Sequence, residues 1–218
     1  MKILITGFDP FGGEAVNPSI ETVRLLPEKI AGADLIKLEI PTSFRRALPA
    51  IEKAIEKYDP DVVLSVGQAG GNAAIAVERV GINLSDARIP DNDGFQPMDE
   101  PIAADGPAAY FTTIPTRRIV ERLRRDGIPA VLSYSAGTFV CNQVTYGVCR
   151  LLATRFPQKQ SGFLHIPYLP SQVADRPQEP SMSQDMLVAA LTAAVETVAA
   201  AWQAEDGSET DRPEEILL

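Results

Sequence analysis

The chain has 218 residues, of which 45% are hydrophobic, so it is long and apolar enough to bury one substantial core. Its net charge of −9 argues against nucleic-acid binding, because no stretch supplies the row of basic side chains that phosphates require. We also expect no membrane segment, since the apolar run at residues 186–202 is interrupted by threonine and glutamate, as in a packed amphipathic helix.

Strands and helices are predicted to alternate along the first half of the chain. Residues 2–6 form a buried strand that runs into the turn-rich loop GFDPFGG (residues 7–13), and NPS (residues 17–19) caps a helix to about residue 26. Residues 34–40 alternate as a strand, and residues 44–58 carry the apolar stripe of a helix. Residues 61–66 are a buried strand that ends in GQAGG (residues 67–71).

The second half continues this alternation around one long loop. Residues 73–84 alternate as a strand or strand pair, and residues 86–107 form a polar, proline-rich loop. A helix at 116–125, a strand at 131–134, a helix that starts near residue 141, a strand at 163–166 and a helix at 183–202 follow. The pattern predicts a single-domain α/β fold, with an open, twisted and mostly parallel sheet and helices on both faces. We expect this domain to span residues 1–203, and residues 204–218 to form an acidic, disordered tail.

Cys141 stands at the turn between a predicted strand and the helix that follows. Unpaired amides and the positive end of the helix dipole favour the thiolate there, which a nucleophilic cysteine requires. The alternative is a small buried hydrophobe, as most free cysteines are. Cys149 lies roughly 12 Å further along the same helix, beyond disulfide reach, and is interpreted as core packing. Two reduced thiols and no signal peptide lead us to expect a cytoplasmic protein.

A cysteine nucleophile needs an imidazole to carry its proton and a third group to orient that imidazole. The only histidine is His165, which lies across one helix from Cys141 in the following strand, a crossover that can return the chain beside its starting strand. Glu78 shares one strand face with Ala76 and Val80, and a carboxylate buried there requires a partner such as an imidazolium. A satisfied core histidine and an exposed sheet edge remain the alternatives.

The long loop offers one more candidate and several acids. Arg88 could stabilise a developing oxyanion, although an ion pair with Asp86 or Asp91 is the more ordinary role for an arginine there. The spacing of the acids does not match a calcium loop, and a lone histidine excludes the H-E-x-x-H zinc motif. No phosphate-binding or dinucleotide-binding glycine motif is present either. We therefore expect no metal and no cofactor.

Several motifs together resemble those of the pyroglutamyl peptidase I (pyrrolidone carboxyl peptidase) family of cysteine peptidases. They run in order between about residues 2 and 202: GFDPFGG, NPS, GQAGG, ERV (78–80), DARIPDN (86–92), GTFVCN (137–142) and HIPYLP (165–170). The resemblance implies a sheet similar to that of nucleoside phosphorylases and a thiol protease that forms an acyl-enzyme. It implies peptides with an amino-terminal pyroglutamyl (5-oxoprolyl) residue as substrates, and a homotetramer. Gln143 departs from the many relatives that have a second histidine there.

The family's functional residues carry over onto matching positions of this sequence. The catalytic triad falls on Glu78, Cys141 and His165, and we assign Arg88 to the oxyanion. The substrate pocket falls on these residues: Phe8, Phe11, Asn17, Thr42, Gln68, Ile89, Phe139 and Val140. Aromatic and aliphatic walls with a few amides suit a flat, neutral lactam ring. Two alternatives stay open, namely a nucleoside phosphorylase-like or hydrolase-like enzyme without a catalytic thiol, and a non-catalytic binder of pyroglutamyl peptides.

Overall fold

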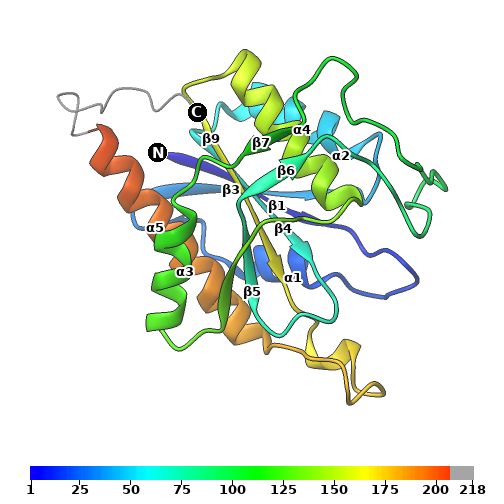
Figure 1. Ribbon diagram of the computed structural model, residues 1–218. Coiled ribbons are helices and arrows are strands. Elements are labelled where there is room, and N and C mark those ends of the chain that lie inside the picture. Colours follow the sequence, from blue (N-terminus) through cyan, green and yellow to red (C-terminus); the bar gives the residue numbers. More distant parts are fainter. Residues whose placement is uncertain (207–218) are drawn as a thin grey trace.

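A seven-stranded sheet runs through the centre of the computed structural model, which describes residues 1–206 (Figure 1). Its strands lie in the order β2-β3-β1-β4-β9-β5-β8. They span these residues: β1 Lys2–Phe8, β2 Lys29–Ile30, β3 Ala33–Ile40, β4 Val62–Gln68, β5 Ile75–Glu78, β8 Ala130–Ser133 and β9 Gln160–Ile166. The β2–β3 and β9–β5 pairs are antiparallel and the other neighbouring pairs are parallel, so the sheet is mixed and mostly parallel, as predicted.

Helices cover both faces of the sheet, as the alternating pattern predicts (Figure 1). The helices span these residues: α1 Pro18–Leu25, α2 Ala47–Tyr58, α3 Thr116–Arg125, α4 Val140–Arg155 and α5 Gln184–Asp206. Helices α2 and α4 pack on one face, where they meet Leu4 and Val63, and the other three pack on the opposite face against Ile3 and Leu64. Side chains of successive strand residues therefore point alternately into two hydrophobic cores, one on each face of the same sheet, within a single domain.

Helix α5 covers the hydrophobic core on the sheet face of Ile3 and Leu64. By length and composition it is apolar enough to cross a membrane over Gln184–Ala204, but 56% of the most apolar 18-residue window there is buried in the fold. Its inward side chains include Leu187, Leu191 and Val195, which are fully buried against the sheet and α1 and α3. This is the position of a core helix, whose apolar face is covered by its own domain.

The structure differs from the predicted elements mainly in short segments. The stretch predicted as a strand or strand pair forms two strands, β5 and β6 (Val80–Ile82), and β6 pairs with β7 (Ala109–Phe111) in a separate two-stranded sheet. Segments such as β2, β7 and the 3-10 helix η1 (Pro170–Gln172) are too short to show a periodicity. Helix α5 continues past the predicted end to Asp206, and the rest of the predicted tail, residues 207–218, lies outside the described residues.

Candidate active site

The thiol of Cys141 is carried on the first turn of α4 and is partly exposed. Phe139 precedes the helix in an extended conformation, and no side chain caps the helix start. The amides of Asn142 and Gln143 donate to the Phe139 carbonyl. The amides of Val140 and Cys141 thus have no acceptor within the described part of the chain, and they remain available at the positive end of the helix dipole.

Asn142 fixes the position of this helix start. It is fully buried, its Oδ1 accepts the amide of Ile82 at 3.0 Å, and its Nδ2 donates to the carbonyls of Ile82 and Leu84 at 2.9 Å each. A buried amide with these bonds satisfied holds its surroundings rigidly. The start of α4 therefore keeps a constant place relative to the segment that follows Glu78.

Sheet register brings His165 to the same side of the sheet as Cys141. His165 lies between Gly67 of β4 and Ala76 of β5, and paired residues on neighbouring strands point to the same face. Gly67 has no side chain, and a Cβ placed there would lie 2.9 Å from the sulfur of Cys141. The sulfur thus occupies the space above Gly67, next to the strand position that holds the imidazole.

Glu78 lies behind His165, on the neighbouring antiparallel strand. It pairs in register with Phe163, two residues before His165, so both side chains face α4. The Nδ1 of His165 and the Oε1 of Glu78 are 2.8 Å apart, and Glu78 is only 1% exposed. The second carboxylate oxygen, Oε2, is buried and has no hydrogen-bond partner among residues 1–206. The imidazole is therefore the group that compensates this buried carboxylate.

The electrostatics of His165 follow from its two neighbours. Burial is the largest single influence and lowers the pKa of His165, because an imidazolium loses its hydration. The charge and hydrogen bond of Cys141, followed by those of Glu78, act in the opposite direction and raise the pKa to about 10. An imidazole in this position holds its proton at neutral pH. By contrast, burial raises the pKa of the Cys149 thiol to about 11, which keeps it unreactive.

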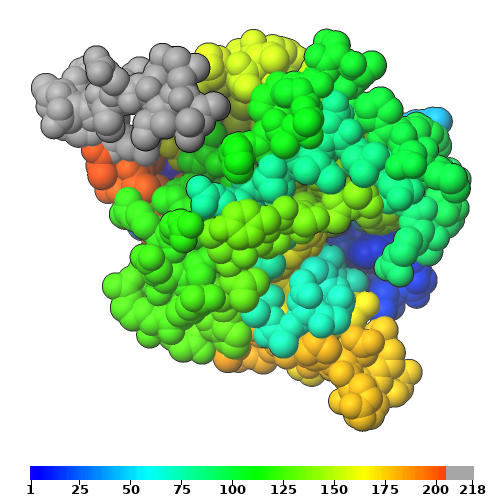
Figure 2. Space-filling model, in the orientation of Figure 1, coloured from blue at the N-terminus to red at the C-terminus, as the bar shows by residue number. Residues whose placement is uncertain are grey.

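A cleft of about 760 Å³ opens over Cys141 and His165. In Figure 2, segments from distant parts of the sequence meet around a hollow to the right of centre. The walls hold seven of the predicted site residues: Phe11, Gln68, Arg88, Ile89, Phe139, Cys141 and His165. The rings of Phe11 and Phe139 lie 6.0 Å apart and form an aromatic wall. Arg88 is exposed on the wall and, among the described residues, pairs with neither Asp86 nor Asp91.

Four further residues predicted for the pocket are buried behind its walls: Phe8, Asn17, Thr42 and Val140. The Nδ2 of Asn17 and the Oγ1 of Thr42 both donate to the carbonyl of Asp9. They thereby hold the loop after β1, which presents Phe11 to the cleft. These residues shape the pocket through the loop rather than by lining it.

The cleft also contains residues for which the sequence analysis predicted no role. Arg176 donates to the Oε1 of Glu14 at 3.0 Å, and its guanidinium lies 5.0 Å from the centre of the Tyr168 ring. This contact joins the loop after β1 to the loop after η1 within the wall of the cleft. Tyr168 belongs to the HIPYLP motif, whereas Arg176 and Glu14 lie 162 positions apart in irregular segments that carry no signal of their contact.

The acids of the long loop organise that loop. Asp91 is buried and accepts hydrogen bonds from the amides of Phe44, Asp93 and Phe95. Asp93 in turn forms a two-point contact with the guanidinium of Arg46. Within residues 1–206, no group of three or more histidine, cysteine, aspartate or glutamate side chains is arranged to hold a metal ion.

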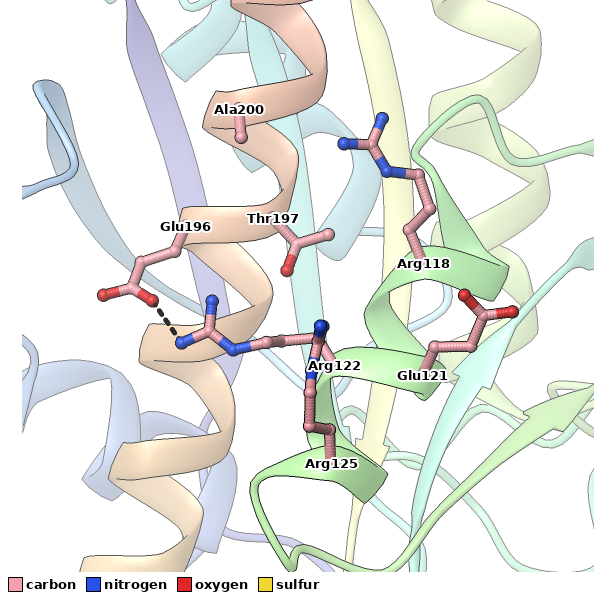
Figure 3. A pocket seen from close by; sticks show the side chains of 7 residues that line it. All are labelled: Arg118, Glu121, Arg122, Arg125, Glu196, Thr197 and Ala200. Atoms are coloured by element: carbon pink, nitrogen blue, oxygen red, sulfur yellow. Dashed lines mark hydrogen bonds and ion pairs between the residues drawn. The ribbon is translucent and has the colours of Figure 1, made fainter.

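A second depression, of about 250 Å³, lies between α3 and α5 on the face of the sheet opposite the cleft (Figure 3). Three arginines line it, and Arg122 donates to Glu196 at 2.8 Å and to Asp126 at 2.6 Å. Neither a cysteine nor the histidine is among the residues that line it. This depression offers neither a thiol nor an imidazole, so the cleft at Cys141 is the candidate active site.

A thiol at a helix start, an imidazole beside it and a carboxylate behind the imidazole form the arrangement of a thiol-dependent hydrolase. Comparison with known proteins identifies a family within this class of hydrolases. The chain belongs to the pyroglutamyl peptidase family, whose model matches residues 1–201.

Relatives and solved structures agree with this family. The chain is 55% identical to the pyrrolidone-carboxylate peptidase of Treponema denticola over 202 residues, 91% of this chain and 93% of the relative. It is 54% identical to that of Levilactobacillus brevis, covering 91% and 97%. The crystal structure of pyroglutamyl peptidase I from Bacillus amyloliquefaciens is similar, with a TM-score of 0.88, 49% identity and coverage of 91% and 94%. A mutant pyrrolidone carboxyl peptidase from Pyrococcus furiosus aligns with a TM-score of 0.89, 41% identity and coverage of 92% and 99%.

Proposed function

We propose that the protein is a cysteine peptidase that removes an amino-terminal pyroglutamyl residue from peptides. The observation that carries the proposal is His165, which is bonded to the buried Glu78 and raised in pKa by Cys141 at the floor of an aromatic cleft. Membership of the pyroglutamyl peptidase family supports this activity over the two alternatives left open by the sequence, the nucleoside-directed enzyme and the non-catalytic binder.

The reaction uses the three side chains in order. The sulfur of Cys141 attacks the carbonyl carbon of the pyroglutamyl residue, and a carbon–sulfur bond forms. His165 gives its proton to the departing amine as the carbon–nitrogen bond breaks, and the shortened peptide leaves. His165 then takes a proton from water, which attacks the thioester carbonyl; the carbon–sulfur bond breaks, and pyroglutamate and the Cys141 thiolate are released beside the protonated imidazole. Glu78 holds the ring orientation throughout and compensates the charge of the imidazolium.

The negative charge that develops on the carbonyl oxygen also needs donors. The amides of Val140 and Cys141 suit this role, because they stand at the start of α4 without an acceptor among the described residues. Arg88 stands on the cleft wall without an ion-pair partner in the described chain, and we assign it to the same oxyanion. The nucleophile and its oxyanion donors thus come from one helix turn and one loop.

The cleft suits the chemistry of the pyroglutamyl ring, a flat and neutral lactam. The rings of Phe11 and Phe139, with Ile89, cover its apolar faces, and Gln68 supplies an amide for its polar edge. An ordinary peptide terminus carries an ammonium, which would be stranded against these rings. Phe8, Asn17, Thr42 and Val140 support these walls from behind.

Hydrolysis of a pyroglutamyl fluorogenic amide tests the proposal directly. We expect Cys141→Ser and His165→Ala each to lose activity by about a thousandfold or more. Cys149→Ser is the matched control and should remain active, because Cys149 is buried away from the cleft. Full activity in either triad variant would contradict the mechanism. Substrate binding without turnover by the unmodified protein would instead indicate a binder.

We further propose that the enzyme works as a homotetramer in the cytoplasm. The tetramer rests on the family resemblance, and the compartment rests on two free cysteines, which suit a reducing environment. Light scattering after size-exclusion chromatography measures the assembly, and a monomeric mass at assay concentration would refute the tetramer.

A further inference from the structure

The side chain of Gln172, on η1, is held by backbone groups whose polarity is fixed. It is 8% exposed, and its Oε1 accepts the amide of Leu169 at 2.9 Å. Its Nε2 lies 3.4 Å from the carbonyl of Val16 and donates to it. An amide nitrogen can only donate and a carbonyl oxygen can only accept, so these two contacts leave one orientation for the Gln172 amide. The group that Gln172 turns toward the cleft is therefore an N–H.

This N–H determines the orientation of Gln68 in the cleft wall. The Nε2 of Gln172 donates to the Oε1 of Gln68 at 3.0 Å, so the oxygen of Gln68 is already engaged. The Nε2 of Gln68 has no acceptor among the described residues, and Gln68 lines the cleft. The Leu169 amide thus fixes the orientation of the Gln172 amide, and Gln172 fixes the orientation of Gln68. As a result, Gln68 offers N–H donors rather than an acceptor to the binding site.

We propose that Gln172 is a positioning residue that sets substrate specificity through Gln68. It keeps the N–H groups of Gln68 available for the ring carbonyl of a pyroglutamyl substrate. This inference rests on the proposed function and adds the residue that fixes the polarity of its binding site. A ring without the carbonyl, such as that of proline, leaves the donors unpaired in a partly desolvated wall, which disfavours its binding.

Reversing the polarity of Gln172 tests the proposal. In Gln172→Glu a carboxylate oxygen replaces the amide nitrogen, so Gln68 is expected to turn over, donate to Glu and present its oxygen to the cleft. An acceptor then faces the carbonyl of the substrate. We expect KM for the pyroglutamyl fluorogenic amide to rise about tenfold, the size of one lost hydrogen bond, with kcat within about twofold of wild type. Gln172→Met keeps the volume and removes the polarity, and its KM should rise less.

A double-mutant cycle separates this role from a structural one. In a Gln68→Met background there is no amide to orient, so adding Gln172→Glu or Gln172→Met should leave KM unchanged. The Gln172→Met arm carries the test alone if the glutamate variant does not fold. An equal rise in KM with and without Gln68, or a wild-type KM in both Gln172 variants, would overturn the proposal. Both results presuppose an active parent enzyme, so they are distinct from a failure of the proposed function, in which the parent itself shows no turnover.

Discussion

Replacing Gly67 by alanine tests how the proposed nucleophile, the Cys141 sulfur, is held in place. A Cβ at this position would lie 2.9 Å from the sulfur of Cys141 and 2.8 Å from Cζ of Phe163. Ordinary contacts between such atoms are about 3.5–4.0 Å, so the sulfur has to withdraw by roughly 0.6–1.1 Å and the Phe163 ring by roughly 0.7–1.2 Å. Phe163 is fully buried and packed against Phe8, whereas Cys141 stands at the open cleft. The sulfur is therefore the neighbour that is freer to move, whereas the contact with Phe163 crowds the core.

A displacement of this size is large for a reacting atom. Misplacing a catalytic group by about 1 Å can cost about a hundredfold in rate, so we expect kcat of Gly67→Ala to fall by about that factor. Crowding in the core should also lower the free energy of unfolding by about 1–3 kcal/mol. Steady-state hydrolysis of the pyroglutamyl fluorogenic amide measures the first effect, and urea unfolding followed by circular dichroism measures the second.

Gly147→Ala is the matched control for this experiment. It also adds one methyl group, here between helices α4 and α2, where the new Cβ would lie 2.8 Å from the end of the Leu48 side chain. That flexible end can rotate away, and the thiol is untouched, so kcat should stay near wild type. If Gly67→Ala folds normally and keeps the kcat of the wild type, the sulfur does not depend on the space above Gly67 and the reasoning is wrong.

Two further predictions concern the titrating groups. The pKa of His165 is raised from 6.5 to about 10, so its contribution to stability is fully present below pH 6.5 and is lost as the pH rises to 10. Thermal unfolding should show Tm falling over this window, and falling less in Cys141→Ala, which lacks the sulfur that raises the pKa; equal slopes in both proteins would contradict the assignment. Iodoacetamide at pH 8 should label the native protein at Cys141 alone, because Cys149 is buried and its pKa is raised to about 11. Mass spectrometry that found Cys149 labelled without unfolding would show that the core is accessible.

Periodicity alone could predict the helices and most strands. Stripes such as the one in α2 repeat over enough residues to identify the element and its buried face. Strand order could not be predicted in the same way, because pairing depends on contacts distant in sequence. The sequence suggested that the connection from β8 through α4 returns the chain beside β8. This prediction was wrong, because β9 does not neighbour β8 in the sheet. Strand β5 lies between β8 and β9, and β9 runs antiparallel to β5.

The candidate site, too, could be predicted from the sequence only in part. A lone histidine and a cysteine at a helix start could be found in the sequence, and the family resemblance added the pocket residues. The reason why Cys141 and His165 meet could not be found, because it depends on the register between Gly67 and His165 and on the missing side chain of Gly67. The pairing of Gln172 with Gln68 was also invisible, since the two residues are 104 positions apart.

The isolated Oε2 of Glu78 has a consequence for the timing of the reaction. In the mechanism proposed above, His165 passes its proton to the departing amine, and the Glu78 carboxylate then loses its nearest opposite charge. No hydrogen bond within the described chain reaches its Oε2. The acylated enzyme is then the state in which this corner of the protein is least well compensated. Drawing a proton back from water relieves that condition, so the same step that frees the product also restores the resting charge balance. In this mechanism, the buried carboxylate of Glu78 thus favours hydrolysis of the thioester over its accumulation.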